Sequence, residues 1–188
     1  MYLNLGKEIE KIGMAHEKQG VRHYKTGDMI VPLHRGKRML EQYGAYQFQL
    51  HRADIHDILV SELRKSSPDS IYVNHQLTDL KESSETVELK FSNGKQYEFD
   101  FVIGADGNRS TVRNIILGDD EPEFAGYVAW RGLVPTKGLS EGDFDDCGSS
   151  AFISPGRVFA RYLVRNGDIY NYVGFLSTDE WAEEGWSI

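Results

Sequence analysis

One short segment constrains the fold more than any other: an apolar run at residues 99–103 that stops at the Gly-Ala-Asp-Gly sequence of residues 104–107. Short, nearly continuous apolar runs are typical of strands that are buried on both faces of a parallel sheet. Apolar residues then recur at helical spacing, with Ser110 or Thr111 in position to cap a helix. The segment therefore predicts a strand, a glycine-lined turn and a helix, the repeating unit of α/β folds.

The chain before this segment changes its apolar period near residue 70. Helical spacing predicts amphipathic helices over residues 3–18 and 53–63, and the Thr-Gly-Asp sequence at 26–28 predicts a hairpin between them. From residue 70 the period becomes two, which is typical of strands with one solvated face. This pattern predicts a three-stranded meander with strands at 71–73, 86–91 and 96–99 and a tight Asn-Gly turn at 93–94.

After residue 118 the character of the chain changes again, because aromatic residues become dense and extended segments predominate. A strand is predicted over 127–135, and a hairpin is predicted from 157–164 and 169–176. We therefore place a domain boundary near residue 120. Residues 1–120 are predicted to form an α/β domain, and residues 121–188 are predicted to begin an antiparallel sheet.

Composition and charge argue against two classes of partner, nucleic acids and membranes. With 21 Lys and Arg against 29 Asp and Glu the formal net charge is −8, whereas nucleic-acid binding requires clustered positive charge. Eight of the acids lie between residues 119 and 146, where we interpret them as solvated loop residues. No apolar run approaches the ~20 residues that span a bilayer, and charges come too early for a signal peptide. We expect a soluble, cytoplasmic protein with neither nucleic-acid nor membrane partners.

The sequence has no motif typical of a metal site or of a hydrolase. The chain has six histidines but no His-Glu-x-x-His sequence, and His51 and His56 do not share a helix face. There is no Gly-x-Ser-x-Gly sequence, and the single cysteine, Cys147, follows an acidic stretch that would not activate a thiol. We therefore expect no metal site, no internal disulfide and no hydrolase.

The turn at 104–107 is the strongest candidate site. Gly104 and Gly107 would let the backbone approach a ligand closely, and the start of the following helix would offer N–H groups suited to phosphate. A tight structural turn explains the same residues. Spacing alone does not decide between these two interpretations.

Three segments, in this order and spacing, resemble the single-component flavin-dependent aromatic hydroxylases, the class of salicylate hydroxylase and para-hydroxybenzoate hydroxylase. Residues 100–113 resemble the Asp-Gly motif of that family, and the His-Arg-Ala-Asp-Ile-His sequence at 51–56 resembles the segment that opens one of its helices. Residues 125–135 are similar to the strand that enters the family's substrate domain, and the hairpin at 162–167 also fits. The resemblance covers nearly the whole chain.

The resemblance implies a fold and a reaction. Residues 1–120 would be part of a Rossmann-like FAD-binding domain with a β-meander, and residues 121–188 the start of an antiparallel-sheet substrate domain. Such enzymes use NADH or NADPH to reduce FAD, and then use O2 to form a C4a-hydroperoxyflavin that hydroxylates a small aromatic, salicylate-like substrate. The cofactor carries that chemistry while the protein orients the ring and excludes water.

The resemblance also implies cofactor-binding residues. Arg52 matches the arginine that lies against the flavin, and its place at a helix start is electrostatically unusual for a purely structural cation. Asp106 and Gly107 match the pair that holds FAD and is implicated in binding the pyridine-nucleotide pyrophosphate. Ser110 and Arg113 match the remaining motif positions, although a helix cap and an ion pair explain them equally well.

Catalytic residues are not identified by these motifs. Tyr162 lies where some relatives present a phenol to the substrate ring, but a core role on an aromatic-rich strand fits it better. Two further hypotheses remain open. The chain could be a non-catalytic remnant or binding module for an aromatic acid, or it could come from a monooxygenase of the same superfamily that acts on a non-aromatic ring.

Two family elements are missing from the sequence: the Gly-x-Gly-x-x-Gly unit of a dinucleotide fold and the second Gly-Asp segment. The chain therefore corresponds to the middle of such an enzyme. We expect the 188 residues alone to bind FAD weakly or not at all and to show no turnover. We also expect the apolar run at 101–103 to be exposed and prone to association.

Overall fold

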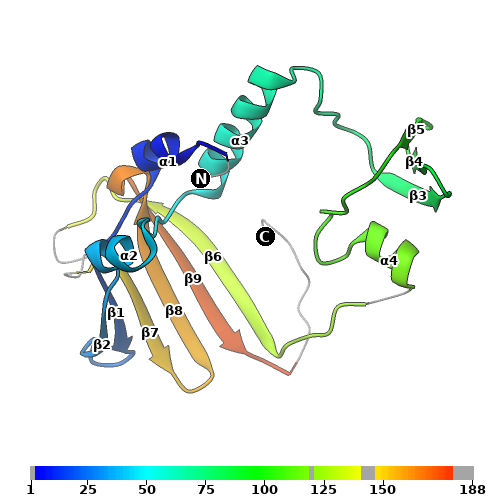
Figure 1. Ribbon diagram of the computed structural model, residues 1–188. Coiled ribbons are helices and arrows are strands. Elements are labelled where there is room, and N and C mark those ends of the chain that lie inside the picture. The colour runs from blue at the N-terminus through cyan, green and yellow to red at the C-terminus, as the bar shows by residue number, and fades with distance from the viewer. Residues whose placement is uncertain (1–2, 119–120, 141–146, 180–188) are drawn as a thin grey trace. The chain divides into compact units, whose positions relative to one another are not determined.

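The computed structural model describes residues 3–118, 121–140 and 147–179 of the chain (Figure 1). The structure divides into two compact units. The first combines Met1–Glu62 with Gly126–Ile188, and the second is Leu63–Ala125. Each unit is built around its own sheet.

The first unit contains a mixed six-stranded sheet in the order β2-β1-β7-β8-β9-β6 (Figure 1). Neighbouring strands are antiparallel except β1 and β7, which pair in parallel although they are far apart in the chain. The strands are β1 (Lys18–His23), β2 (Met29–His34), β6 (Tyr127–Pro135), β7 (Ser149–Ser154), β8 (Arg157–Val164) and β9 (Ile169–Ser177).

The hairpins of this sheet confirm the turn signals of the sequence. β1 and β2 are joined through Gly27, which has a φ of +75° that favours glycine. β8 and β9 are joined through the short turn η2 (Arg165–Gly167), where Arg165, Asn166 and Gly167 all have positive φ. The predicted strand over 127–135 is confirmed as β6.

Three helices accompany this sheet: α1 (Gly6–Ile12), α2 (Gly36–Tyr43) and α3 (Arg52–Ser66). The predicted helix over residues 3–18 is wrong in its second half. Met14 leaves the helix to form a bridge with Gln49, and β1 begins at Lys18, because pairing with other segments overrides the helical spacing. His16 is buried and its Nε2 donates to the carbonyl of Leu163 at 3.2 Å.

The second unit consists of the three-stranded antiparallel sheet β3-β4-β5 and helix α4. The predicted strand at 71–73 is wrong, since the first strand lies further along and Asn74, with a φ of +58°, turns the chain before it. The Asn-Gly turn is confirmed, and Gly94 has a φ of +81°. The elements are β3 (Leu77–Glu82), β4 (Val87–Phe91), β5 (Gln96–Phe99) and α4 (Thr111–Leu117).

The apolar run that predicted a doubly buried strand is exposed. β5 ends at Phe99, and the side chains of Phe101 and Ile103 are 73% and 80% exposed. A strand needs a neighbour to pair its N–H and C=O groups, and no described strand lies beside residues 101–103. The expectation of a buried parallel strand is therefore wrong for this structure, while the expected exposure of the run is confirmed.

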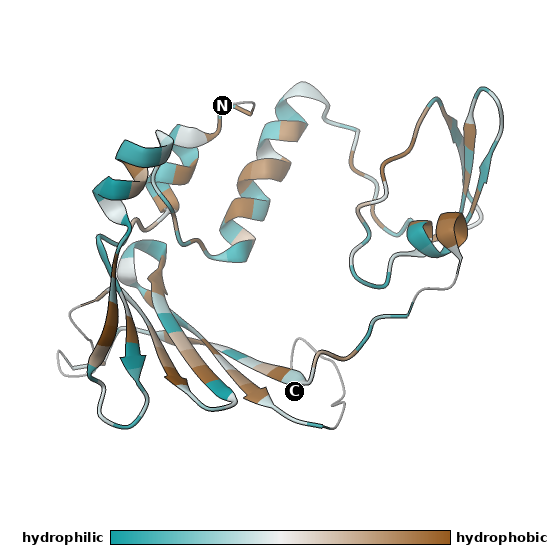
Figure 2. Cartoon of the chain, turned by 60° about the horizontal axis from the view of Figure 1, so that its bottom comes forward, coloured by the Kyte–Doolittle hydropathy of each residue, from teal (hydrophilic) through white to brown (hydrophobic). Residues whose placement is uncertain are grey.

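The core of the larger sheet lies around the β8–β9 hairpin. Val164 is completely buried, and Tyr170 and Val173 are nearly so, whereas Leu89 is the corresponding buried residue of the smaller sheet. Figure 2 shows apolar and polar residues alternating along the strands of the larger sheet, as expected for a sheet whose two faces differ.

The boundaries of the compact units differ from those of the predicted domains. The hairpin of β1 and β2 belongs to the same sheet as β7, so residues from both sides of position 120 share one unit. The assignment of residues 1–120 to an FAD-binding domain and 121–188 to a substrate domain stays a prediction.

Candidate functional site

The start of α3 carries the first candidate residue. Arg52 is the first residue of this helix and is exposed, and Asp54 lies in the same first turn. A helix start has a positive dipole end, so an acid there is favoured and a cation is not. Arg52 therefore lies at a position that electrostatics alone would not select for it.

Asp54 is held by an arginine from the far end of the chain. The Nη2 of Arg165 donates to Oδ1 of Asp54 at 2.6 Å, and its Nε donates to Oδ2 at 2.9 Å. These charge-assisted hydrogen bonds hold the pKa of the Asp54 carboxyl below its usual value. The ion pair fastens the first turn of α3 to the turn between β8 and β9, so two of the sequence motifs meet in space.

A polar row crosses the larger sheet close to this ion pair. Ser149 on β7 lies opposite Tyr162 on β8, and Tyr162 lies opposite Asn171 on β9. Residues directly opposite each other in a ladder project from the same face. Gln49, from the segment that leads into α3, donates from its Nε2 to the Ser149 hydroxyl at 3.0 Å. Tyr162, predicted from resemblance, thus lies in this row between two polar residues, Ser149 and Asn171, and Gln49 is hydrogen-bonded to the first of them.

The second candidate motif is a closed network at the start of α4. The hydroxyl of Ser110 and the backbone N–H of Val112 both donate to the carboxylate of Asp106. Ser110 in turn caps the helix, because its Oγ accepts from the N–H of Arg113 at 3.0 Å. The hydrogen bond from Ser110 and then that from Val112 lower the pKa of Asp106. Asp106 and Ser110, rather than an external anion, therefore accept from the N–H groups of Val112 and Arg113 in the first turn.

Positions 104 and 107 of this motif favour glycine for different structural reasons. A Cβ on Gly104 would lie 2.7 Å from a methyl carbon of Val112, so the turn can pack on α4 only with glycine there. Gly107 has a φ of +84° and open space where a side chain would stand. Arg113 donates from its guanidinium to the carbonyl of Asn108, which keeps its side chain beside the turn.

The predicted residues divide between the two units. Arg52 and Tyr162 lie in the unit of the larger sheet, and Asp106, Gly107, Ser110 and Arg113 lie in the smaller one. Their roles toward a cofactor stay predictions. Sequence reasoning missed the residues that touch or flank Arg52 and Tyr162 through long-range contacts. These residues are Gln49, Asp54, Ser149, Arg165 and Asn171, of which the strand register, had it been known, would have identified Ser149 and Asn171.

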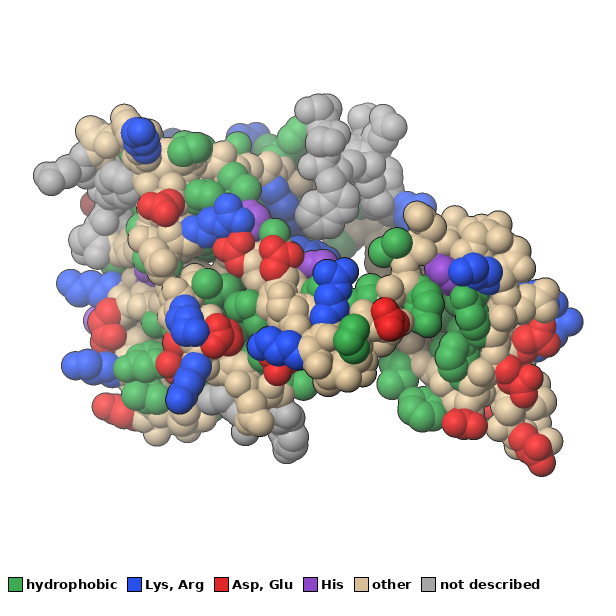
Figure 3. Space-filling view, turned by 90° about the horizontal axis from the view of Figure 1, so that it is seen from above, with side chains coloured by type: hydrophobic (Ala, Val, Ile, Leu, Met, Phe, Trp, Pro, Cys, Tyr) green, Lys and Arg blue, Asp and Glu red, His purple; other side chains and the backbone are tan. Residues whose placement is uncertain are grey.

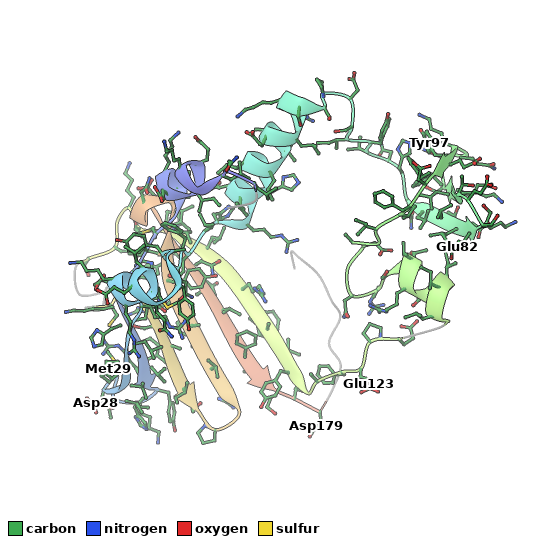
Figure 4. The ribbon with its side chains drawn as sticks, in the orientation of Figure 1. Asp28, Met29, Glu82, Tyr97, Glu123 and Asp179 are labelled. Carbon is green, nitrogen blue, oxygen red and sulfur yellow. The ribbon has the colours of Figure 1, made fainter. Side chains whose placement is uncertain are left out.

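Two of the hollows of the described residues lie elsewhere on the units. One, of about 520 Å³, is lined by Phe152, Phe159 and Arg161 on the face of the larger sheet opposite to Tyr162. The other, of about 390 Å³, is lined by aromatic rings of the smaller unit, among them Tyr97 on β5 (labelled in Figure 4) and His75. Figure 3 shows apolar side chains gathered on the smaller unit.

The described part of the chain has neither a membrane-spanning helix nor a metal-binding cluster. None of its helices has the length and apolar character needed to cross a bilayer. Among the same residues, no three His, Cys, Asp or Glu side chains gather into a group that could hold a metal ion.

Comparison with known families matches residues 3–160 to the FAD binding domain family. The chain is 32% identical to the 6-hydroxynicotinate 3-monooxygenase of Pseudomonas fluorescens over 191 residues, which cover 95% of this chain and 48% of that enzyme. It is 33% identical to the 3-amino-4-hydroxybenzoate 2-monooxygenase of Streptomyces cremeus over 165 residues, which cover 88% of this chain and 41% of that enzyme. The chain thus spans about half the length of the curated relatives it matches.

Solved structures give the same picture of the fold. A salicylate hydroxylase in complex with its substrate is similar with a TM-score of 0.73 and 25% identity, covering 98% of this chain and 47% of that one. HpxO of Klebsiella pneumoniae, solved with FAD and uric acid, has a TM-score of 0.83 at 22% identity and covers 97% of this chain and 45% of that one. The α+β architecture of this chain is therefore that of a large part of these flavoproteins.

Proposed function

This chain belongs to the FAD binding domain family, the family of its monooxygenase relatives, and on that premise we propose that its protein is an FAD-dependent, NAD(P)H-using monooxygenase. The substrate is a small hydroxylated aromatic ring, and O2 supplies the oxygen atom. Relatives that act on 6-hydroxynicotinate and 3-amino-4-hydroxybenzoate support this substrate class. We propose a cytoplasmic location for the same reaction, since NAD(P)H is its reductant.

The observation that carries the proposal is the ion pair of Asp54 with Arg165. It joins the helix start that carries Arg52 to the hairpin that carries Tyr162, although the two paired residues lie 111 positions apart in the chain. A hydroxylase must hold its cofactor and its ring next to each other, and a fixed contact between the two motifs serves this geometry.

The residues at the start of α3 fit an anionic cofactor such as FAD. Arg165 pairs with Asp54, and the exposed guanidinium of Arg52 lies at the start of the 15-residue helix, where the helix dipole has its positive end. Both suit a pyrophosphate or an electron-rich ring system. Gly107, with open space above its Cα, is the corresponding feature of the other motif.

FAD, when bound, supplies the transfer of electrons from NAD(P)H to O2. The work of this chain is to bind and to orient. Arg52 holds the cofactor electrostatically, Asp54 and Arg165 fix the helix start that presents Arg52, and the row containing Tyr162 positions the ring. Asp106 and Ser110 stabilise the turn that carries Gly107.

A hybrid enzyme tests the proposal. This chain would replace the matching 48% of the 6-hydroxynicotinate 3-monooxygenase of Pseudomonas fluorescens. We expect the purified hybrid to retain flavin, to oxidise NAD(P)H faster when a hydroxylated aromatic acid is added, and to give a product heavier by one oxygen atom in mass spectrometry.

The matched variants separate binding from folding. Arg52→Ala in the hybrid should weaken flavin retention, whereas Arg38→Ala, on an exposed face of α2, should not. A hybrid that folds and retains flavin yet hydroxylates no ring in a panel of phenols, hydroxybenzoates and hydroxypyridines would refute the proposed activity.

A further inference from the structure

The hollow of about 520 Å³ lies on the face of the larger sheet opposite to Tyr162, and Phe159 lines its floor. In the ladder, Phe159 lies between Phe152 on β7 and Gly174 on β9. Gly174 brings no side chain to this face, and even a Cβ there would stay 3.8 Å from the Phe159 ring. Phe159 is therefore 43% exposed, and the hollow beside it stays open to a ligand.

The Phe159 ring is held by rings from both neighbouring strands. It stacks on Tyr172 of β9, with 5.9 Å between the ring centroids, and the Phe152 ring of β7 lies 6.4 Å from it. A ring fixed in this way loses little freedom when a flat ligand stacks on it. The floor of the hollow thus suits a planar aromatic ligand.

Two arginines flank Phe159 on its own strand. Arg157 and Arg161 lie two positions to either side and on the same face, each about 7 Å away along β8. The guanidinium of Arg161 lies over the rings of Phe152 and Tyr170, 5.3 and 5.5 Å from their centroids. Arg157 is exposed, and its guanidinium forms no ion pair or hydrogen bond with the residues that the structure describes. Arg157 is therefore the cation that can pair with a ligand in the hollow.

The charge of this face selects the kind of ligand. None of the 29 Asp and Glu of the chain lies in the six strands of the larger sheet, and Arg22 on β1, opposite Phe152, adds a further cation to the face. The net charge of the chain is −8, so this positive face is a local feature. It favours an anion with an apolar body. A second copy of the chain, paired symmetrically through this face, would bring the same cations against each other.

We infer that this hollow is a binding site for a small aromatic anion, whose ring stacks on Phe159 and whose carboxylate pairs with Arg157. Arg161 and Arg22 add positive charge around the ring. The sheet separates a ligand in the hollow from Tyr162, so this ligand is an effector and not the ring that is hydroxylated. The site goes beyond the proposed function and does not depend on it.

Two probes with the same ring system, one charged and one neutral, test the inference on the full chain without flavin. The ¹⁵N-labelled protein would be titrated with 2-naphthoate and with 2-naphthylmethanol. We expect 2-naphthoate to shift the backbone amide signals of Phe159 and Gly174 and the Nε–H signal of Arg157, and to reach saturation. The neutral probe should bind about tenfold more weakly, because it cannot form the charge-assisted hydrogen bonds of a carboxylate.

Matched variants separate the arginine from the fold. Arg157→Gln should weaken the binding of 2-naphthoate about tenfold and leave that of 2-naphthylmethanol unchanged. The control is Arg131→Gln, because Arg131 is also exposed but lies opposite Val173, on the face of Tyr162. It should change neither affinity. Gly174→Leu, which fills the hollow, should abolish the binding of both probes.

Four results would overturn the inference: equal affinity of the two probes, signals that move along the row of Tyr162 or in the smaller unit instead, equal losses in Arg157→Gln and Arg131→Gln, or no saturable shift. The signal map and the comparison of probes use the unaltered chain, so they decide the matter even if a variant fails to fold. Because no flavin is present, the result is independent of whether the hybrid enzyme hydroxylates a ring.

Discussion

The starts of α3 and α4 each hold an aspartate by hydrogen bonds, but the partners come from different distances along the chain. Each carries an aspartate whose pKa is lowered by hydrogen bonds, Asp54 at one and Asp106 at the other. The partner of Asp54 is Arg165, 111 positions along the chain, whereas the partners of Asp106 are Ser110 and Val112, four and six positions away. One helix start depends on the whole larger sheet, and the other is complete within a single turn and helix.

This difference teaches how much of each region depends on the rest of the molecule. A local network forms once a few neighbouring residues fold, because little chain entropy is lost in closing a short loop. A contact over 111 positions exists only when β8 and β9 have paired and packed. Disturbing the larger sheet should therefore loosen the start of α3 while leaving the start of α4 intact.

The largest effect on stability is expected from Gly148→Ala, which disturbs the larger sheet, the region that depends on long-range contacts. A Cβ at this position would lie 2.0 Å from Nδ1 of His16, whose ring is held by its hydrogen bond to Leu163. Overpacking of this kind costs about 1–3 kcal/mol. Thermal unfolding should show the loss, and Gly174→Ala, where the nearest atom would be 3.8 Å away, should be nearly neutral. Equal stability of the two variants would contradict the close packing of Gly148 against His16.

Ser110→Ala disturbs the local network at the start of α4. It should lower the free energy of unfolding by about 1 kcal/mol, the usual value for a lost helix cap. Ser110 both donates to Asp106 and accepts from the N–H of Arg113, so both bonds are lost. Hydrogen exchange should become faster at residues 104–117 and stay unchanged in β8 and β9. Faster exchange across the larger sheet would show that the network is not local.

His16 gives the larger sheet a dependence on pH near neutrality. Burial lowers the pKa of His16 from 6.5, so the unfolded chain binds its proton more readily than the folded one. Stability should be full above about pH 6.5 and should fall as the pH drops toward the folded pKa. Urea unfolding at pH 7.5 and 5.5 should reveal this, and His16→Gln should flatten the difference. An unchanged slope in the variant would assign the pH dependence to other groups.

The two aspartates should affect stability at lower pH than His16 does. Hydrogen bonds to the ionised carboxylates, rather than burial, lower their pKa values. Both pKa values are lowered in the folded state, so their contribution to stability is present above about pH 4 and is lost as the pH falls through the folded values. Asp54→Asn should weaken the acid dependence of β8 and β9 in hydrogen exchange, and Asp106→Asn that of α4. If either variant altered hydrogen exchange equally in both regions, the two helix starts would not be independent of each other.

The smallest effect on folding is expected from Phe101→Ser. The side chain is 73% exposed and supports no described strand, so the free energy of unfolding should change by no more than about 0.5 kcal/mol. Self-association, measured by gel filtration and dye binding, should decrease, since an exposed apolar run promotes it. A clean monomer in the unaltered chain would contradict this expectation.

The contrast between the two helix starts also explains what could be predicted from the sequence. The cap by Ser110, the Asn-Gly turn at 93–94 and the β8–β9 hairpin depend on neighbouring residues and were predicted correctly. The helix over 3–18 was wrong in its second half, where pairing with distant segments decided the structure, and the strand at 71–73 was wrong because Asn74 turns the chain before β3. Ser149 and Asn171 could not be identified, because the register of paired strands places them beside Tyr162, and Gln49 could not be identified because a long-range hydrogen bond connects it to Ser149.

The parallel pairing of β1 with β7 has a consequence for synthesis on the ribosome. Gln19 pairs with Ser149, so at 5–20 residues per second β1 emerges roughly 6–26 seconds before its partner strand. During that interval the edge of β1 that later pairs with β7 is open, whereas the unit of residues 63–125 has already been synthesised and can fold. Vectorial synthesis thus imposes an order, with the inserted unit first and the larger sheet last, and the waiting hairpin is the part of the nascent chain that most needs protection by a chaperone.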